Sequence, residues 1–139
     1  TYTVLGDSVN LGSRLESLTK FYGVKLLVGE GTYDLAPQFL YRTVDKIIVK
    51  GKREPVLVYE PVCRIEHASE SRLQRVEQYN TALAHYYSRE WDAAEKILRQ
   101  LHKGDPERKL YNMYLERIDE LRYEVLPSDW MGVFEHRSK

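Results

Sequence analysis

The sequence predicts an α+β protein, in which a β-α-β-β unit is followed by an α-helical extension. Short β-favouring runs punctuated by glycine and proline occupy residues 1–63, whereas apolar residues recur at helical intervals over 73–139. Polar residues break the hydrophobic pattern between these parts, and we interpret 64–72 as a linker. One amphipathic helix lying on a sheet, with further helices beyond it, is an α+β layer arrangement.

The chain opens with a strand, a tight turn and a helix. A β-favouring run ends at Leu5, Gly6 permits the turn, and Asp7 or Ser8 can accept a hydrogen bond from the first free helical amides. Apolar residues at helical intervals then continue the helix until Gly23, a natural helix terminator. We expect this helix to bury one apolar side.

Further strands follow this helix. Residues 25–28 favour a strand, and 32–36 favour one short helical turn. The runs 40–50 and 56–60 are rich in β-branched and aromatic residues, and the glycine and proline within 51–55 mark a turn between them. These two runs are predicted to form a β-hairpin. The unit has too few strands to be stable alone.

The second half is predicted to be helical. Apolar residues keep a helical period from Leu73 and again from Trp91, and the segment 104–106 ends the second helix. A third helix is predicted from Glu107 until Pro127 stops it. The chain closes with apolar residues that we expect to pack back onto the protein: Trp130, Val133 and Phe134.

Composition excludes several classes of protein. Twenty-one basic residues offset twenty-one acidic ones, so no overall field attracts a nucleic acid polymer. Cys63 has no second cysteine for an internal disulfide, and we interpret it as a small, half-buried apolar residue. No apolar run approaches the ~20 residues that cross a bilayer. We therefore expect a cytoplasmic location, with any membrane anchor of a longer parent lying upstream.

Two groups of polar residues are candidates for binding an anion. Asn10 and Arg14 are four residues apart, so they project from one face of the predicted helix, where an amide beside a guanidinium suits a polyphosphate. Lys50, Lys52 and Arg53 lie at the predicted hairpin turn. Spacing alone does not distinguish an anion-binding site from residues that are merely exposed to solvent, and the second is the more common case for each group.

Both groups lie in segments that resemble a known family. Residues 2–16 (YTVLGDSVNLGSRLE) and 49–56 (VKGKREPV) are similar to the C-terminal half of class III adenylate and guanylate cyclase catalytic domains. The resemblance covers 1–61 and implies part of a ferredoxin-like fold. The tail, including 129–134 (DWMGVF), resembles the helical extension of some bacterial members, and 75–106 resembles one tetratricopeptide repeat.

The resemblance implies conversion of ATP to cyclic AMP and pyrophosphate. In that family the residue matching Arg14 stabilises charge that develops at the α-phosphate, and the residue matching Asn10 orients the ribose. Lys50 matches a lysine that contacts the terminal phosphates. Thr3 matches a position that helps to select the base, and a threonine there is compatible with adenine.

The resemblance also implies what lies outside this chain. The family uses two Mg²⁺ or Mn²⁺ ions, whose aspartate ligands belong to the N-terminal half of the domain, and no residue here matches them. Two catalytic domains pair head to tail, so each active site lies at a homodimer interface. Because the chain opens inside a strand and without an initiator methionine, we expect it to be a piece of a longer protein. Because it can supply only the residues that match Thr3, Asn10 and Arg14 and not the metal ligands, we expect it to be inactive by itself.

Other functions remain open at this stage. The chain could belong to a catalytically silent cyclase-like domain that serves as a dimer partner or scaffold, or to a guanylate cyclase. A single tetratricopeptide-like repeat is too short for an independent solenoid. The extension is therefore expected to cap the preceding unit or to pack in a dimer, with binding of a protein partner as the alternative.

Overall fold

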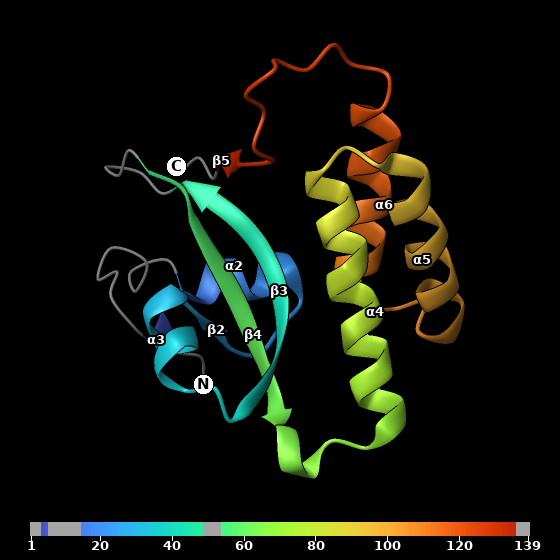
Figure 1. Ribbon diagram of the computed structural model, residues 1–139. Coiled ribbons are helices and arrows are strands. Elements are labelled where there is room, and N and C mark those ends of the chain that lie inside the picture. The colour runs from blue at the N-terminus through green and yellow to red at the C-terminus, as the bar shows by residue number, and fades with distance from the viewer. Residues whose placement is uncertain (1–3, 6–14, 49–53, 136–139) are drawn as a thin grey trace.

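The protein combines one mixed sheet with two groups of helices, so the predicted α+β class is confirmed (Figure 1). The computed structural model describes residues 4–5, 15–48 and 54–135. Its elements in chain order are β1 (Val4–Leu5), α2 (Leu15–Tyr22), β2 (Leu27–Val28), α3 (Glu30–Leu35), β3 (Phe39–Ile48), β4 (Val56–Arg64), the 3-10 helix η1 (Ile65–His67), α4 (Glu70–Tyr87), α5 (Trp91–Gly104), α6 (Lys109–Leu121) and β5 (Phe134–Glu135).

The five described strands lie in the order β1-β2-β4-β3-β5. β1 pairs parallel with β2, β4 pairs antiparallel with both β2 and β3, and β5 pairs parallel with β3. All strands except β4 therefore point the same way. The carboxyl ends of β1 and β3 consequently reach the same edge of the sheet.

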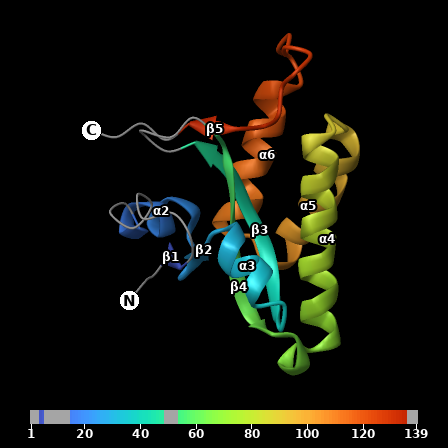
Figure 2. The same ribbon diagram turned by 60° about the vertical axis from the view of Figure 1, so that its left-hand side comes forward.

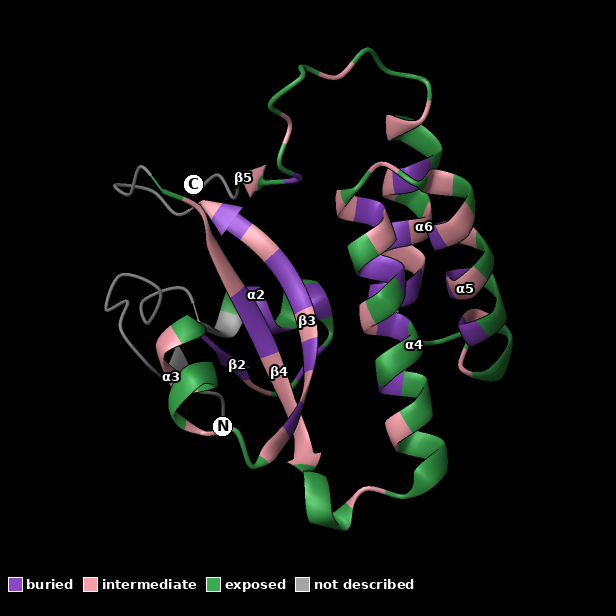
Figure 3. Ribbon diagram, in the orientation of Figure 1, coloured by how far each residue is buried: buried purple, intermediate pink, exposed green. Residues whose placement is uncertain are grey.

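The helices divide into two groups. α4, α5 and α6 stand together beside β3, whereas α3 lies with β2 and β4 (Figures 1 and 2). Buried residues occur along β3 and β4 and in the helical group (Figure 3). They form one continuous hydrophobic cluster, which includes Leu18 of α2, Val58 of β4, Tyr79 of α4, Leu98 of α5 and Tyr114 of α6. The helical extension and the sheet thus share one core.

The extension also satisfies the backbone of β3 on the side that β4 leaves open. The Asn80 amide of α4 accepts a hydrogen bond from Thr43 N at 3.0 Å and donates one to Tyr41 O at 2.9 Å. The Tyr114 hydroxyl of α6 donates to Val44 O at 2.8 Å, within a register irregularity of β3. These groups act as a neighbouring strand would, and so cover an edge that would otherwise expose unpaired peptide groups.

Most predicted elements are present, with changed bounds. Gly23 has φ +70° directly after α2, as its role as terminator requires. β4 continues to Arg64, beyond the predicted end of its strand, and Cys63 within it is half-buried, as expected. The four described strands of the first half, β1 to β4, each overlap a predicted strand. The division of the chain at 64–72 stays a prediction.

Two findings at the end of the chain differ from expectation. The prediction that Pro127 ends the third helix is wrong, because α6 ends at Leu121. The residues that follow, among them Tyr123 and Val125, are exposed and give a longer helix no apolar face to bury. Phe134 does pack back onto the protein, and it does so as part of β5, a strand that the sequence did not predict.

We expect Asn80→Ala to lower the free energy of unfolding by about 1–3 kcal/mol, because it leaves the peptide groups of Thr43 and Tyr41 without partners. Urea denaturation measures the change. Gln78→Ala, on an exposed side of the same helix, is the control and should change stability by less than about 0.5 kcal/mol. Equal losses for the two variants would contradict the role given to Asn80.

Candidate functional site

The four candidate residues from the sequence, Thr3, Asn10, Arg14 and Lys50, lie outside the described residues. The described chain closely flanks them. β1 begins at Val4, directly after Thr3, and α2 begins at Leu15, directly after Arg14. β3 ends two residues before Lys50. The described elements β1, α2 and β3 therefore indicate where these residues enter and leave the fold.

Two of these elements end at one edge of the sheet. β1 and β3 point the same way, so the chain leaves Leu5 and Ile48 on the same edge. The segment 6–14, with Asn10 and Arg14, starts at the first of these points. The segment 49–53, with Lys50, starts at the second. Ligand sites commonly lie beyond the carboxyl ends of strands in sheets with parallel pairs.

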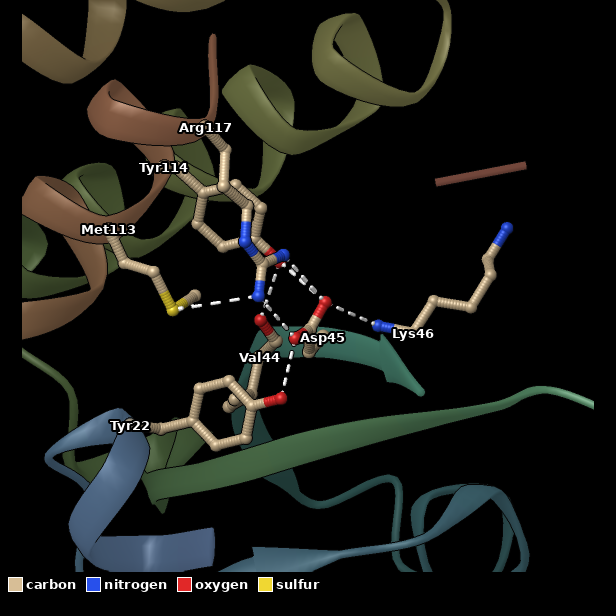
Figure 4. Close-up of polar contacts among 7 residues, drawn as sticks. All are labelled: Tyr22, Val44, Asp45, Lys46, Met113, Tyr114 and Arg117. Atoms are coloured by element: carbon tan, nitrogen blue, oxygen red, sulfur yellow. Dashed lines mark hydrogen bonds and ion pairs between the residues drawn. The ribbon is translucent and has the colours of Figure 1, made fainter. Parts of the chain in front are cut away.

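A buried carboxylate on β3 organises the described residues near this edge. Asp45 is fully buried, and its side chain lies among groups from α2, β3 and α6 (Figure 4). The Tyr22 hydroxyl donates to Asp45 Oδ2 at 2.5 Å, and Lys46 N donates to Oδ1 at 2.9 Å. The Tyr114 hydroxyl lies 3.2 Å from Oδ1. Each carboxylate oxygen thus has hydrogen-bond donors, as a buried charge requires.

Arg117 of α6 supplies the opposite charge. Its Nη1 donates to Asp45 Oδ1 at 3.0 Å and its Nη2 donates to Oδ2 at 2.8 Å, a bidentate pair (Figure 4). The guanidinium also lies over the rings of Phe134 and Tyr114, 4.4 Å and 4.9 Å from their centroids. A planar, delocalised cation can make both kinds of contact at once, whereas a lysine cannot.

Burial and this charge pair change the pKa values within the cluster. Burial alone would lower the pKa of Arg117, but the hydrogen bonds and negative charge of Asp45 outweigh it and raise that pKa. Burial, and then the Asp45 charge, raise the pKa of the Tyr22 hydroxyl. Tyr22 therefore stays a neutral donor and Arg117 a cation. The raised pKa values of Tyr22 and Arg117 suit these two residues to a positioning role.

A second set of contacts fixes the beginning of β4. Leu57 N donates to the Glu30 carboxylate of α3 at 3.0 Å. Tyr59 stacks on Tyr33 of α3 with ring centroids 4.0 Å apart, and its partial burial raises the pKa of Tyr59 to about 12. α3 thus holds the strand that returns from the hairpin, just as Asp45 holds the strand that enters it.

No described residues offer a metal site or a membrane span. Within 4–5, 15–48 and 54–135, no three His, Cys, Asp or Glu residues gather to hold a metal ion. None of the helices in these ranges is long and apolar enough to cross a bilayer. A hollow of about 510 Å³ beside α5 is lined by Arg89, Asp92 and Arg122, among others, but Asp92 and Arg122 already pair with each other.

The Asp45–Arg117 pair was not predicted from the sequence. Each residue carried a weak signal. Asp45 interrupts the β-favouring run of β3, and Arg117 lies three residues after Tyr114 and one before Ile118, on the apolar side of α6. A charged residue at a buried position usually has a partner. The partner could not be assigned because the two residues are far apart in the chain.

Two adenylate cyclases resemble part of this chain. "Adenylate cyclase, terminal-differentiation specific" of Dictyostelium discoideum is 42% identical over 64 residues, which are 43% of this chain and 3% of that protein. "Adenylate cyclase" of Anabaena cylindrica is 44% identical over 62 residues, which are 42% of this chain and 12% of that protein. The chain matches no protein-family model, and no solved structure matches it significantly.

About two fifths of the chain is therefore an adenylate cyclase-related region. The chain spans only a small part of either relative, so the activity of a whole cyclase does not follow from the match alone. What the described structure adds is an edge of the sheet where β1 and β3 both end, and a buried charge pair that anchors the extension close to it.

We expect Arg117→Met to lower the free energy of unfolding by about 3–5 kcal/mol, because it leaves the buried Asp45 carboxylate without its counter-charge. The double variant Asp45→Asn with Arg117→Met should recover much of this loss. Chemical denaturation of the 139-residue chain measures both variants. A double variant no more stable than Arg117→Met would argue against the unpaired charge as the cause.

Proposed function

We propose that this chain is the C-terminal half of the catalytic domain of a class III adenylate cyclase, followed by a helical extension that caps its sheet. The identity of 42% and 44% to two adenylate cyclases is the observation that carries the proposal. The topology supports it, because the segments with Asn10, Arg14 and Lys50 start from the same edge of the sheet.

In the proposed reaction the ribose 3′-oxygen of ATP attacks the α-phosphorus. The new O3′–P bond closes the cyclic nucleotide, the bond from the α-phosphorus to the bridging oxygen breaks, and pyrophosphate leaves while the hydroxyl proton is lost. Arg14 would stabilise the charge growing on the α-phosphate, and Asn10 would orient the ribose. A fixed cation is most effective where charge develops in the transition state.

Thr3 and Lys50 would bind the two ends of the substrate. Lys50 would contact the terminal phosphates from the hairpin between β3 and β4. Thr3, directly before β1, would form a hydrogen bond with the adenine base, which favours ATP over GTP. The chain would then supply the base-selecting and transition-state residues of a site at a head-to-tail homodimer interface.

The metal-binding part of the site would come from upstream sequence. Two Mg²⁺ or Mn²⁺ ions would assist the attack and the departure of pyrophosphate. The described residues hold no candidate ligand cluster, so no step through a metal is assigned to them. The extension would act as a cap, since Asn80 and Tyr114 already bind β3 on its helical side.

We expect Arg14→Ala in the full-length protein to lower kcat for cyclic AMP formation by roughly 10²-fold or more, because the transition state loses its cation. Arg72→Ala, an exposed arginine at the start of α4, is the control and should leave kcat unchanged. Near-normal activity of Arg14→Ala would refute the assignment. Faster turnover of GTP than of ATP would indicate a guanylate cyclase, and no turnover by the wild type would indicate a silent scaffold.

We expect the purified 139-residue chain to form no cyclic AMP from ATP with either magnesium or manganese, because the proposed metal ligands lie upstream of it. The assay is chromatographic detection of cyclic AMP and pyrophosphate. Sustained turnover by the pure chain, abolished by Arg14→Ala, would show that the site is complete without an upstream half.

A further inference from the structure

α6 contacts both elements that flank the candidate site. Arg117 binds Asp45 in the second half of β3, the strand that leads to Lys50. At its beginning, α6 contacts the end of α2, the helix that starts after Arg14. Lys109 Nζ donates to Lys20 O at 2.9 Å, and α2 returns a contact through Tyr22 to Asp45. One helix of the extension thus fixes α2 relative to β3.

β5 continues this connection to the last described residues of β3. Phe134 lies opposite Ile47 and Glu135 opposite Ile48, so the end of β3 has a strand on each side. The Phe134 ring lies under the Arg117 guanidinium and 5.6 Å from the ring of Phe21 in α2. β5 pairs with β3 over only two residues, so the position of β5 also depends on these contacts of the Phe134 ring.

These contacts link the extension to both β3 and α2, and so limit how far the two elements can move. Arg117 holds Asp45 and the Phe134 ring, and Phe134 in turn holds the end of β3, two residues before Lys50. The described part of α2 spans eight residues, so anchoring its last turn also limits movement of Leu15. Functional side chains need such support, because small displacements of a binding group are costly for catalysis.

We propose that Arg117 and Phe134 are positioning residues for a nucleoside triphosphate. They fix the end of β3 relative to α2, the two described elements that flank the candidate residues. The inference rests on the proposed function and extends it, because it makes the helical extension part of the substrate site's support. It also assigns the two residues different effects. Phe134 pairs with the end of β3 and contacts α2 only through the Phe21 ring, whereas Arg117 holds the Asp45 carboxylate that also binds Tyr22 of α2.

A matched control lies directly after the same helix. Arg122, five residues after Arg117, binds Asp92 and Glu95 of α5, each at 3.0 Å. These ion pairs hold α6 to α5, within the extension. Arg122→Gln therefore weakens the extension itself, whereas Arg117→Lys and Phe134→Leu weaken its attachment to the sheet. Arg117→Lys keeps a positive charge beside Asp45, so it avoids a buried, unpaired carboxylate.

The test measures kcat and KM for ATP in the full-length protein, well below the melting temperature of each variant. Phe134→Leu should raise KM about tenfold with a smaller change in kcat, because it loosens the end of β3, two residues before Lys50. Arg117→Lys should raise KM and also lower kcat about tenfold, because it displaces the Asp45 carboxylate that binds Tyr22 of α2 as well. Arg122→Gln should change neither constant, even where it lowers the melting temperature as much.

Hydrogen exchange gives a second readout that does not depend on activity. Amides of 46–48 and 56–58 should exchange faster in Phe134→Leu than in wild type or Arg122→Gln. Unchanged kinetics and exchange in both attachment variants would overturn the inference while leaving the proposed function intact. A wild type that forms no cyclic AMP, or an Arg14→Ala variant with normal activity, would instead overturn the proposed function and this inference with it.

Discussion

The buried ion pair between Asp45 and Arg117 connects the two halves of this protein. Asp45 lies on β3 and Arg117 on α6. The Asp45 side chain is 0% exposed and the Arg117 side chain 13% exposed, so water does not fully solvate either charge in the folded state. Burying both charges is costly unless their geometry is satisfied. Here the bidentate contact, the Tyr22 hydroxyl and a backbone amide provide that geometry. We infer that the pair contributes more to how the extension docks than to net stability.

This docking explains how a sheet of short strands is stable. β1, β2 and β5 have two residues each, and only β3 and β4 are long. The extension contributes β5, the Asn80 side chain and the larger part of the shared core to β3. The helical layer thus completes the sheet and shares its core. Capping of the sheet, rather than binding of a protein partner, stays a prediction.

The sequence predicted those features that depend on local patterns. Glycine at 23 and the turn at 51–55 indicated where elements end or reverse, and helical periodicity indicated α4 and α5. β5 was not predictable, because two residues carry no period and pair with β3 only after the helices have docked. The Asp45–Arg117 contact was not predictable either, since it joins residues of distant elements. The candidate residues Thr3, Asn10, Arg14 and Lys50 came from resemblance to cyclases, and their spacing alone would not have identified a nucleotide site.

Nucleotide binding at the edge where β1 and β3 end is the claim on which the other proposals depend. The most direct measurement is hydrogen exchange of the full-length protein with and without α,β-methylene-ATP, in which the bond broken in the proposed reaction cannot react. We expect the analogue to slow exchange over 6–16 and 49–56, while α5 keeps its exchange rates. Protection confined to other parts of the chain, or none at saturating analogue, would contradict a nucleotide site at this edge.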